Sequence, residues 1–335
     1  MSFSKSYLST KLDVVGIGNA IVDILIQVDD SFLKENNLKK GSMALLDEQK
    51  AKDLYYKFSA GLKTSGGSAA NTLTGIAQLG GKSGFIGRVR NDELGKTFSK
   101  DIYNSGTIFN TPASEEGPST ARCMIFITPD AQRTMCTYLG ASVLIEPEDL
   151  DFSLVENSKV VYLEGYLWDN SAAKRAFIKA AEVAKASGGE VALSLSDPFC
   201  VDRHRESFTE LVTEYIDILF ANESEIISLY QSHTFENALN ELKNKCKISA
   251  ITRGDKGSVI LSKEDIININ PYSFGKAIDT TGAGDIYAGG FLYGYTSGKD
   301  LKQCGKIGSI CAGQIVTQLG PRSNTNLLEL ITNNL

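Results

Sequence analysis

The sequence predicts an α/β layered fold with a largely parallel sheet. Short β-rich segments alternate with longer segments of helical periodicity, and the strands are apolar on both faces, as in a sheet covered by helices on each side. The expected strands are residues 13–18, 85–87, 160–163, 191–193, 216–220 and 248–251, with a further strand at 258–262. The expected helices are residues 69–79, 93–105, 171–186, 208–214, 223–230, 235–245, 284–296, 301–319 and 327–332.

Two segments interrupt this alternation. Residues 25–46 contain extended, alternating pieces, and residues 119–138 resemble two strands around a turn at 128–131. Together they predict a small β-sheet that projects from the main layer, where a lid over the ligand-binding edge is its natural role. An extension of the main sheet's edge is the alternative. We therefore expect one domain over residues 1–335, with a lid built from about 25–46 and 107–141.

The composition excludes several classes of protein. The 335 residues carry 34 basic and 40 acidic side chains, a net charge of −6 that disfavours a non-specific binder of nucleic acid or anionic membranes. The six cysteines form no C-x-x-C pair and there are two histidines, so a zinc site is not expected. Residues 1–5 lack the apolar core of a signal peptide, and no segment is apolar enough to span a membrane. A reducing cytoplasm is the expected location.

Two glycine-rich nucleotide motifs are incomplete. Residues 16–21 follow a strand, but Ile21 stands where G-x-G-x-x-G needs its third glycine, which disfavours a dinucleotide site. A P-loop at Gly81-Lys82-Ser83 would need a glycine at Ile76, and one at Gly95-Lys96-Thr97 would need a glycine at Arg90. The sequence therefore contains neither motif.

Residues 279–285, with the sequence DTTGAGD, precede a long helical segment. Gly282, Ala283 and Gly284 are small, so a phosphate can approach backbone amides at a helix start, where the helix dipole also favours negative charge. Asp285 can accept a proton from a hydroxyl that attacks the γ-phosphorus of ATP. The alternative is an ordinary glycine turn in which the aspartate stabilises the helix start.

Two further groups of residues fit a substrate that carries hydroxyls. Residues 66–71, GGSAAN, place small residues at a helix start, with an Asn71 amide that can donate and accept. Asp23 follows the first strand, and a carboxylate beyond a strand end can bridge neighbouring hydroxyls. A plain turn and a solvated aspartate are the respective alternatives.

The ordered pair of GGSAAN and DTTGAGD, roughly 210 residues apart, resembles the two signatures of the ribokinase-like (PfkB) carbohydrate and nucleoside kinase family. The resemblance extends over nearly the whole chain. It implies a three-layer α/β/α ribokinase-like fold with a β-sheet lid and an ATP-dependent transfer to an alcohol group. It also implies that Asp285 is the catalytic base, that the amides of 282–285 form the anion hole, and that the lid arginine, Arg133, neutralises phosphate charge. An exposed turn arginine is the alternative for Arg133.

The same resemblance assigns binding residues. It implies that substrate hydroxyls are held by Asn19, Asp23, Gly66, Gly67 and Asn71. The segment NESE resembles the family's N-x-x-E motif, in which Asn222 and Glu225 organise Mg²⁺ and its waters, whereas a helix cap is their ordinary role. Residues 252–257 resemble the family's T-x-G-x-x-G turn beside the nucleotide, although a plain hairpin turn fits equally. Its members here are Thr252, Gly254 and Gly257. Several members bind a monovalent cation such as K⁺ near Asp279, which the sequence leaves open.

Longer segments, among them SDPFCVDRHR, resemble the bacterial branch of this family assigned as adenosine kinases. That implies transfer to the 5′-hydroxyl of adenosine, giving AMP. Met43, Tyr138 and Trp168 could supply flat apolar surfaces for a purine, with core packing as the alternative. Fructose, ribose and 2-keto-3-deoxygluconate are the alternative substrates, and a non-catalytic binding protein is the alternative class. A small-molecule partner is expected, with no nucleic acid or membrane, and either a monomer or a homodimer.

Overall fold

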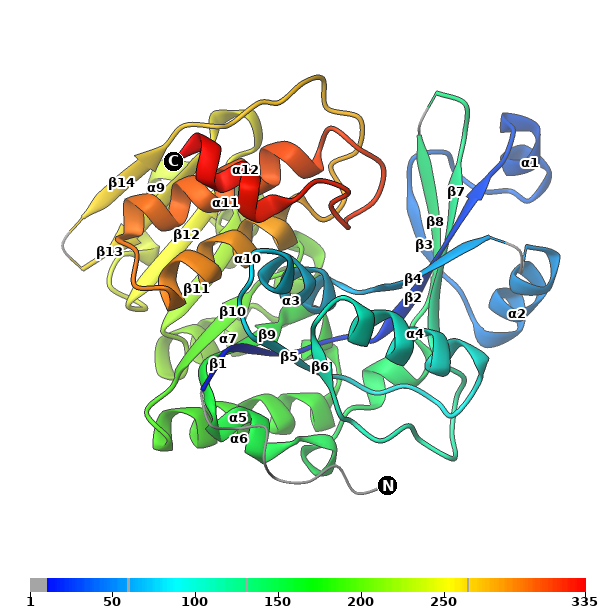
Figure 1. Cartoon of the computed structure of the whole chain (residues 1–335), viewed down its shortest axis with the longest axis horizontal. Coiled ribbons are helices and arrows are strands. Elements are labelled where there is room, and N and C mark those ends of the chain that lie inside the picture. Colours follow the sequence, from blue (N-terminus) through cyan, green and yellow to red (C-terminus); the bar gives the residue numbers. More distant parts are fainter. Residues whose placement is uncertain (1–10, 59–60, 131, 264) are drawn as a thin grey trace.

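The computed structural model describes residues 11–58, 61–130, 132–263 and 265–335. The first ten residues of the predicted domain, including the segment considered for a signal peptide, and Ala131 of the predicted turn lie outside that part. The described chain forms a large sheet covered by helices and a smaller sheet beside it (Figure 1).

The large sheet has the order β14-β13-β12-β11-β10-β9-β1-β5-β6. From β12 to β6 all neighbours are parallel, and β13 and β14 are antiparallel additions at one edge. The strands are β1 (Leu12–Ile17), β5 (Ser83–Ile86), β6 (Ile108–Phe109), β9 (Ser158–Glu164), β10 (Glu190–Ser194), β11 (Ile218–Asn222), β12 (Ile248–Thr252), β13 (Ser258–Ser262) and β14 (Ile266–Ile269).

Helices cover both faces of this sheet, which confirms the predicted α/β layers. Alternate strand residues point into opposite cores: Val15 and Val161 pack with α5–α9, whereas Val14 and Val160 pack with α3, α4 and α10. The helices are α3 (Ser68–Gln78), α4 (Glu93–Asn104), α5 (Phe152–Glu156), α6 (Ser171–Ala186), α7 (Pro198–Glu214), α8 (Glu223–Leu229), α9 (Phe235–Leu242), α10 (Ala283–Thr296), α11 (Leu301–Ile315) and α12 (Leu327–Asn334), with short 3₁₀ segments η1 (Gly140–Leu144), η2 (Pro147–Asp149), η3 (Gly165–Asp169) and η4 (Gly254–Lys256).

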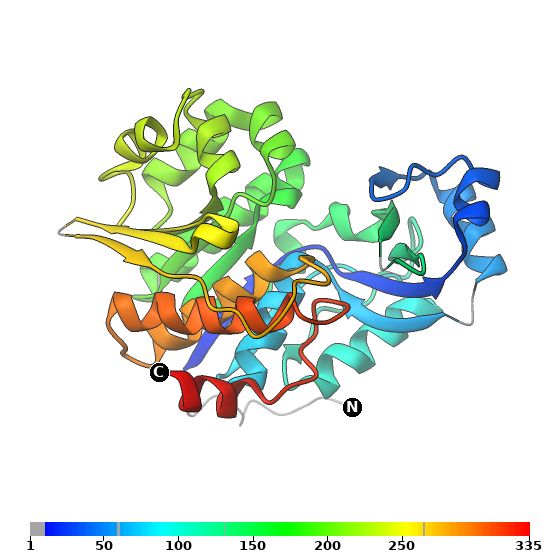
Figure 2. The same cartoon turned by 90° about the horizontal axis from the view of Figure 1, so that it is seen from above.

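The second sheet has the order β3-β8-β7-β2-β4 and stands to one side of the main body in both views (Figures 1 and 2). It is a separate sheet, so it is not an extension of the large sheet's edge. One of its faces packs under two short helices, where Phe126 contacts Phe32 and Phe58. Its strands are β2 (Ile21–Gln27), β3 (Met43–Leu45), β4 (Leu62–Gly66), β7 (Ala121–Ile127) and β8 (Arg133–Tyr138), and the helices are α1 (Asp30–Glu35) and α2 (Glu48–Lys57).

Several elements differ from the prediction, and α2, α5, β6 and β14 are among those that were not expected. Strand β4 was not expected, and the chain between β2 and β3 forms α1 rather than extended pieces. Helix α7 begins ten residues before the expected position 208, because Pro198 stands in its first turn and the Asp197 carboxylate accepts a hydrogen bond from the Cys200 amide. A kink at His204 interrupts the helical periodicity on which the prediction depended.

The two sheets meet where β1 runs into β2 with three residues between them. Strands β9 to β12 are parallel to β1, so their carboxyl ends lie at the same edge as this junction. Open α/β sheets bind ligands at that edge. The space between the two sheets is therefore where this fold would bind a ligand.

Candidate active site

A cavity of about 370 Å³ lies at this junction. The large sheet contributes residues that follow the carboxyl ends of its strands, and the second sheet contributes one of its faces. The starts of α3 and α10 supply the remaining wall. Six predicted side chains line it together, namely Asp23, Asn71, Asn222, Glu225, Thr252 and Asp285, as do Gly67, Gly282 and Gly284.

Asp285 lies in the first turn of α10, as predicted. The turn forms because Gly282 adopts a φ of 76°, and a Cβ there would come within 2.4 Å of Pro321. A Cβ on Gly284 would meet nothing within 4 Å, so the space beside this helix start is open to a ligand. Gly284 lines the cavity whereas Ala283 does not. The arrangement fits an anion held by amides beside a carboxylate.

Both oxygens of the Asp285 carboxylate are held by the start of α3. The Ser68 hydroxyl donates to Oδ1 at 2.6 Å, and the Asn71 Nδ2 donates to Oδ2 at 3.0 Å. Burial raises the pKa of Asp285, and these hydrogen bonds and the positive charge of Arg322 lower it. The Asn71 Oδ1 atom is buried without a partner among the described residues, which suits a substrate hydroxyl.

The turn that precedes α3 depends on Gly67. Its φ is 99°, and a Cβ there would lie 2.1 Å from the Asn19 carbonyl oxygen. Gly66 ends β4, which pairs with β2 beside the Asp23 carboxylate. Burial raises the pKa of Asp23 to about 7, with Arg322 and Arg133 lowering it in turn. Asp23 thus faces the cavity as a buried carboxyl beside two cationic groups.

Asn19 does not line the cavity, which corrects the expectation that it contacts substrate. Its Nδ2 donates to Glu164 Oε1 at 2.7 Å, and its Oδ1 accepts from the Ser142 hydroxyl at 2.8 Å. Glu164, which the sequence analysis missed, also accepts from the Ala69 amide at 2.8 Å, and burial raises its pKa to about 7. Asn19 and Glu164 therefore support the turn below the cavity. An acidic residue at the end of the apolar β9 was the available signal.

Asn222 and Glu225 form a capping box at the start of α8. The Asn222 Oδ1 accepts from the Glu225 amide at 2.9 Å, and Glu225 accepts from the Asn222 amide at 2.9 Å and from its Nδ2 at 2.6 Å. Both also line the cavity, so the capping and ligand-binding interpretations are compatible. Burial raises the pKa of Glu225 to about 7, and the negative charges of Asp197 and Asp285 add to the effect.

The residues predicted beside the nucleotide extend from this wall. Thr252 ends β12 and lines the cavity. Gly254 and Gly257 lie in the turn between β12 and β13, outside the cavity lining. That turn is held by Arg253, whose Nε donates to Glu223 at 2.8 Å.

Arg133 is buried rather than exposed, contrary to the turn alternative. It begins β8 and forms an ion pair with Asp279, with Nη2 and Oδ2 2.9 Å apart. The same carboxylate accepts from the amides of Gly320 at 2.8 Å and Thr281 at 3.0 Å. The Nε and Nη1 atoms of Arg133 are buried with no hydrogen-bond partner among the described residues. The second sheet is thus joined to the DTTGAGD segment by a guanidinium with spare donors.

Two of the three side chains considered for contact with a purine do not line the cavity. Met135 and Thr137 of β8 line the cavity, so Tyr138 points to the opposite face, where its ring lies against the Arg122 guanidinium. Trp168 is packed between Phe177 and Phe208 in the core. Met43 pairs with Met135 across β3 and β8, so it shares the cavity-facing side of the sheet. It is exposed at the sheet's edge, outside the lining.

The cavity has an apolar wall that the sequence analysis did not identify. It consists of side chains that alternate along three strands of the second sheet and face the carboxylates of the large sheet. The alternation of side chains along each strand can be recognised in the sequence, but the pairing of these strands cannot. The wall consists of Ile21, Cys123, Ile125 and Met135.

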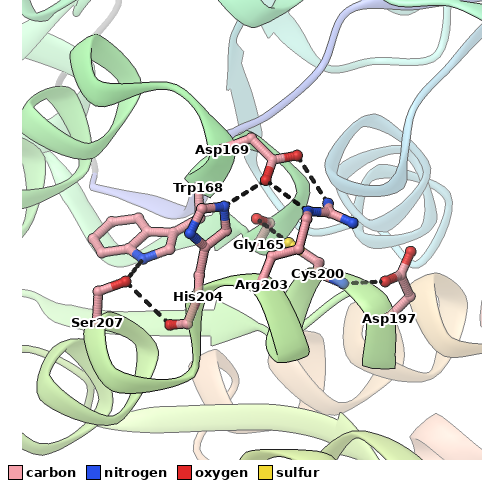
Figure 3. Close-up of polar contacts among 8 residues, drawn as sticks. All are labelled: Gly165, Trp168, Asp169, Asp197, Cys200, Arg203, His204 and Ser207. Carbon is pink, nitrogen blue, oxygen red and sulfur yellow. Dashed lines mark hydrogen bonds and ion pairs between the residues drawn. The ribbon is translucent and has the colours of Figure 1, made fainter.

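The segment SDPFCVDRHR, residues 196–205, supports one wall of the cavity. Ser196 lines the cavity and its hydroxyl accepts from the Tyr166 amide at 3.1 Å, so Tyr166 is held at the cavity's rim. Figure 3 shows the supporting contacts: Asp169 lies between Arg203 and His204, and Cys200 donates to the Gly165 carbonyl. These contacts tie η3, which follows β9, to the start of α7.

A carboxylate beside a helix start that can bind an anion suits phosphoryl transfer from ATP, and both line this cavity. The fold and the site are those of an ATP-dependent phosphotransferase that acts on an alcohol group. The chain belongs to the pfkB family of carbohydrate kinases, whose model matches residues 35–327.

Three relatives illustrate the range of this similarity. The structure of an adenosine kinase from Sinorhizobium meliloti is 45% identical, with a TM-score of 0.89 over 97% of this chain and 100% of that chain. A probable sugar kinase from Rhizobium etli CFN 42 gives the same identity and TM-score over 97% of this chain and 99% of that chain. The adenosine kinase of Saccharomyces cerevisiae is 26% identical over 330 residues, which are 92% of this chain and 96% of that protein.

The described residues contain no group of three or more His, Cys, Asp or Glu side chains that could hold a metal ion. None of the described helices is both long and apolar enough to cross a membrane.

Proposed function

We propose that this protein is an adenosine kinase, which transfers the γ-phosphoryl group of ATP to the 5′-hydroxyl of adenosine and produces AMP. The observation that carries the proposal is that the cavity has one polar wall and one apolar wall. Buried Asp23 and the unpartnered Asn71 oxygen suit ribose hydroxyls, and the apolar wall of the second sheet suits a flat purine. The adenosine kinases among its relatives support the same substrate.

A sugar kinase is the second candidate. The relative from Rhizobium etli at 45% identity is a probable sugar kinase, and the same hydroxyl-binding residues would serve a sugar. A sugar leaves the apolar wall without a partner of matching chemistry, and burial of apolar surface contributes roughly 25 cal/mol for each Å². The presence of that wall favours the nucleoside.

In the proposed reaction the second sheet acts as a lid over the cavity. Asp23 and Asn71 hold the substrate hydroxyls, and closure excludes water that would otherwise hydrolyse ATP. Asp285 accepts the proton of the attacking hydroxyl as the bond to the γ-phosphorus forms and the bond from that phosphorus to the bridging oxygen of ADP breaks. The amides of 282–285 and the spare donors of Arg133 stabilise the negative charge of the transferring group.

The proposed magnesium site involves Asn222 and Glu225, acting through water. The Glu225 carboxylate accepts both its protein hydrogen bonds from Asn222, which fixes its direction toward the cavity. Mg²⁺ would supply charge neutralisation at the phosphates when bound. We propose no potassium site, because the Asp279 carboxylate that such an ion would need is held by Arg133 and two amides. We propose that the reaction takes place in the cytoplasm, which the use of ATP and the free cysteines support.

A panel of acceptors tests the substrate. ADP release with Mg²⁺-ATP is measured for adenosine, other nucleosides, ribose, fructose and 2-keto-3-deoxygluconate. We expect kcat/KM for adenosine to exceed that for any sugar by at least about 10²-fold, because a sugar leaves polar and apolar groups of the site unmatched. Thermal stabilisation by each acceptor gives an independent measure of binding.

The matched control for this panel is Ile125→Asn, which makes the apolar wall polar without touching the hydroxyl-binding residues. We expect it to raise KM for adenosine by roughly 10-fold and to leave the values for sugars nearly unchanged. A sugar preferred over adenosine in the wild type, with no effect of Ile125→Asn on its KM, would establish the sugar kinase instead.

The metal proposal predicts the behaviour of Glu225→Gln. The neutral amide keeps one of the two hydrogen bonds from Asn222 and loses the charge, so the Mg²⁺ concentration for half-maximal rate should rise about 10-fold or more. Rates are measured against free Mg²⁺ at saturating ATP. Glu236→Gln is the control, since Glu236 also lies in the first turn of a helix but is exposed. An unchanged magnesium requirement in Glu225→Gln would remove Glu225 from the metal site.

A further inference from the structure

Arg322 lies in the segment between α11 and α12, and no role follows for it from the sequence motifs. Its Nη2 donates to the Ser65 carbonyl at 2.6 Å and to the Ser65 hydroxyl at 3.0 Å, and its Nη1 donates to the Ala70 carbonyl at 3.3 Å. Ser65 and Ala70 flank the four residues 66–69. One guanidinium therefore joins both ends of the turn that precedes and begins α3.

That turn carries the groups that hold Asp285. Ser68 and Asn71 donate to its two oxygens, and each lies within three residues of a carbonyl bound by Arg322. The bond to Ser65 is reinforced from the other side, because the Asp101 carboxylate accepts from the Ser65 amide and hydroxyl, both at 2.7 Å. Displacing Arg322 would release the turn and with it the two donors to Asp285.

The charge of Arg322 also acts on the cavity. Arg322 interacts electrostatically with Asp23 and Asp285, and also with Asp101 of α4. Burial lowers the pKa of Arg322 to about 10, so the side chain still carries its charge at neutral pH. Its Nε atom is buried with no hydrogen-bond partner among the described residues.

Arg322 is the positively charged group that acts on Asp285. The negative charge of Asp285 acts on several groups whose pKa is raised mainly by burial, Asp23 among them. Arg133 lowers the pKa of Asp23, but it is not among the groups that act on Asp285. Arg322 is thus the cation that lowers the pKa of both carboxyls. The titratable groups on surrounding elements that interact electrostatically with Asp285 are Asp23, Tyr162, Glu164, Tyr166, Glu225 and Arg322.

We infer that Arg322 is a positioning residue for phosphoryl transfer, which clamps the turn at residues 66–69 and keeps Asp23 and Asp285 negatively charged. The inference rests on the proposed role of Asp285 as the base, and it assigns the two effects to different properties of one side chain. The clamp needs a planar group that reaches two carbonyls, whereas the electrostatic effect needs only a positive charge.

Two substitutions separate these properties. Arg322→Gln removes the charge, and Arg322→Lys keeps the charge but cannot bridge both carbonyls in the same way. We measure kcat and kcat/KM from about pH 5.5 to 9.5 with the acceptor that the wild type prefers, since an acid limb reports the free enzyme's base. Arg175→Gln, at an exposed position on α6, is the control for the loss of one arginine and should match the wild type at every pH.

For Arg322→Gln we expect the acid limb of kcat/KM to move to higher pH by about one pH unit, because an opposite charge nearby favours the ionised carboxylate. The loss should therefore be largest at low pH and should diminish toward pH 9. For Arg322→Lys we expect an acid limb within a few tenths of the wild type and a kcat about 10-fold lower at all pH values, as the turn is no longer clamped.

An Arg322→Gln profile that is lowered uniformly, with its acid limb unmoved, would overturn the electrostatic part. A wild-type kcat in Arg322→Lys would overturn the clamp, and that arm stands even if Arg322→Gln does not fold. Asp285→Asn, assayed alongside, separates the two levels of inference: wild-type turnover in that variant contradicts the base itself, whereas an inactive Asp285→Asn with no pH shift in Arg322→Gln contradicts only the role of Arg322.

Discussion

Replacement of Asp285 by asparagine should lower kcat by at least about 10²-fold, because the attacking hydroxyl loses its proton acceptor. The substitution preserves size and most of the local hydrogen bonding. An asparagine can turn its oxygen toward the Asn71 Nδ2 and its amide toward the Ser68 hydroxyl, which can accept as well as donate. The fold and the binding of the acceptor should therefore persist while turnover falls.

The measurement is ADP release at saturating Mg²⁺-ATP and acceptor, with KM for the acceptor determined separately. We expect KM to change by less than about three-fold, since the interaction removed is one that matters mainly in the transition state. Asp300→Asn is the matched control, because Asp300 caps α11 far from the cavity and asparagine caps as well as aspartate. Near wild-type turnover in Asp285→Asn would show that another group takes the proton.

The sequence predicted those parts of the site that lie within a single motif. The start of α10 at DTTGAGD and the start of α3 at GGSAAN each follow from small residues before a helix, and Asn222 and Glu225 follow from a capping pattern of fixed spacing. Such features depend on contacts between residues a few positions apart. The local sequence contains all the information that they require.

The parts that escaped prediction depend on pairing between distant segments. The apolar wall exists because β2 pairs with β7 and β7 with β8, and the sequence does not state that register. The face of β8 that carries Tyr138 could not be predicted for the same reason, since a shift by one residue reverses a strand's faces. Glu164 and Arg322 act on residues 95 or more positions away, so no spacing rule identifies them.

For Arg133, the motif and the structure each contribute part of the interpretation. Its removal should give the second largest loss of turnover. The motif comparison predicts a lid arginine at the phosphates, whereas the structure adds a buried ion pair with Asp279. Arg133→Met alone would confound the two roles. It removes positive charge from the transferring phosphoryl group and also leaves the Asp279 carboxylate buried without its partner, which typically costs about 3–5 kcal/mol of stability.

A double variant, Arg133→Met with Asp279→Asn, separates catalysis from stability. Replacing both charges relieves the unpaired carboxylate, so the free energy of unfolding, measured by denaturant titration, should return to within about 1–2 kcal/mol of the wild type. Turnover should stay lower by roughly 10²–10³-fold, because the charge stabiliser is still missing. Asp279→Asn alone, which keeps Arg133, should retain more turnover than either variant that lacks it. If the double variant instead regained wild-type turnover together with its stability, Arg133 would serve only to hold the second sheet in place, and the phosphoryl charge would have to be stabilised by the 282–285 amides and the metal alone.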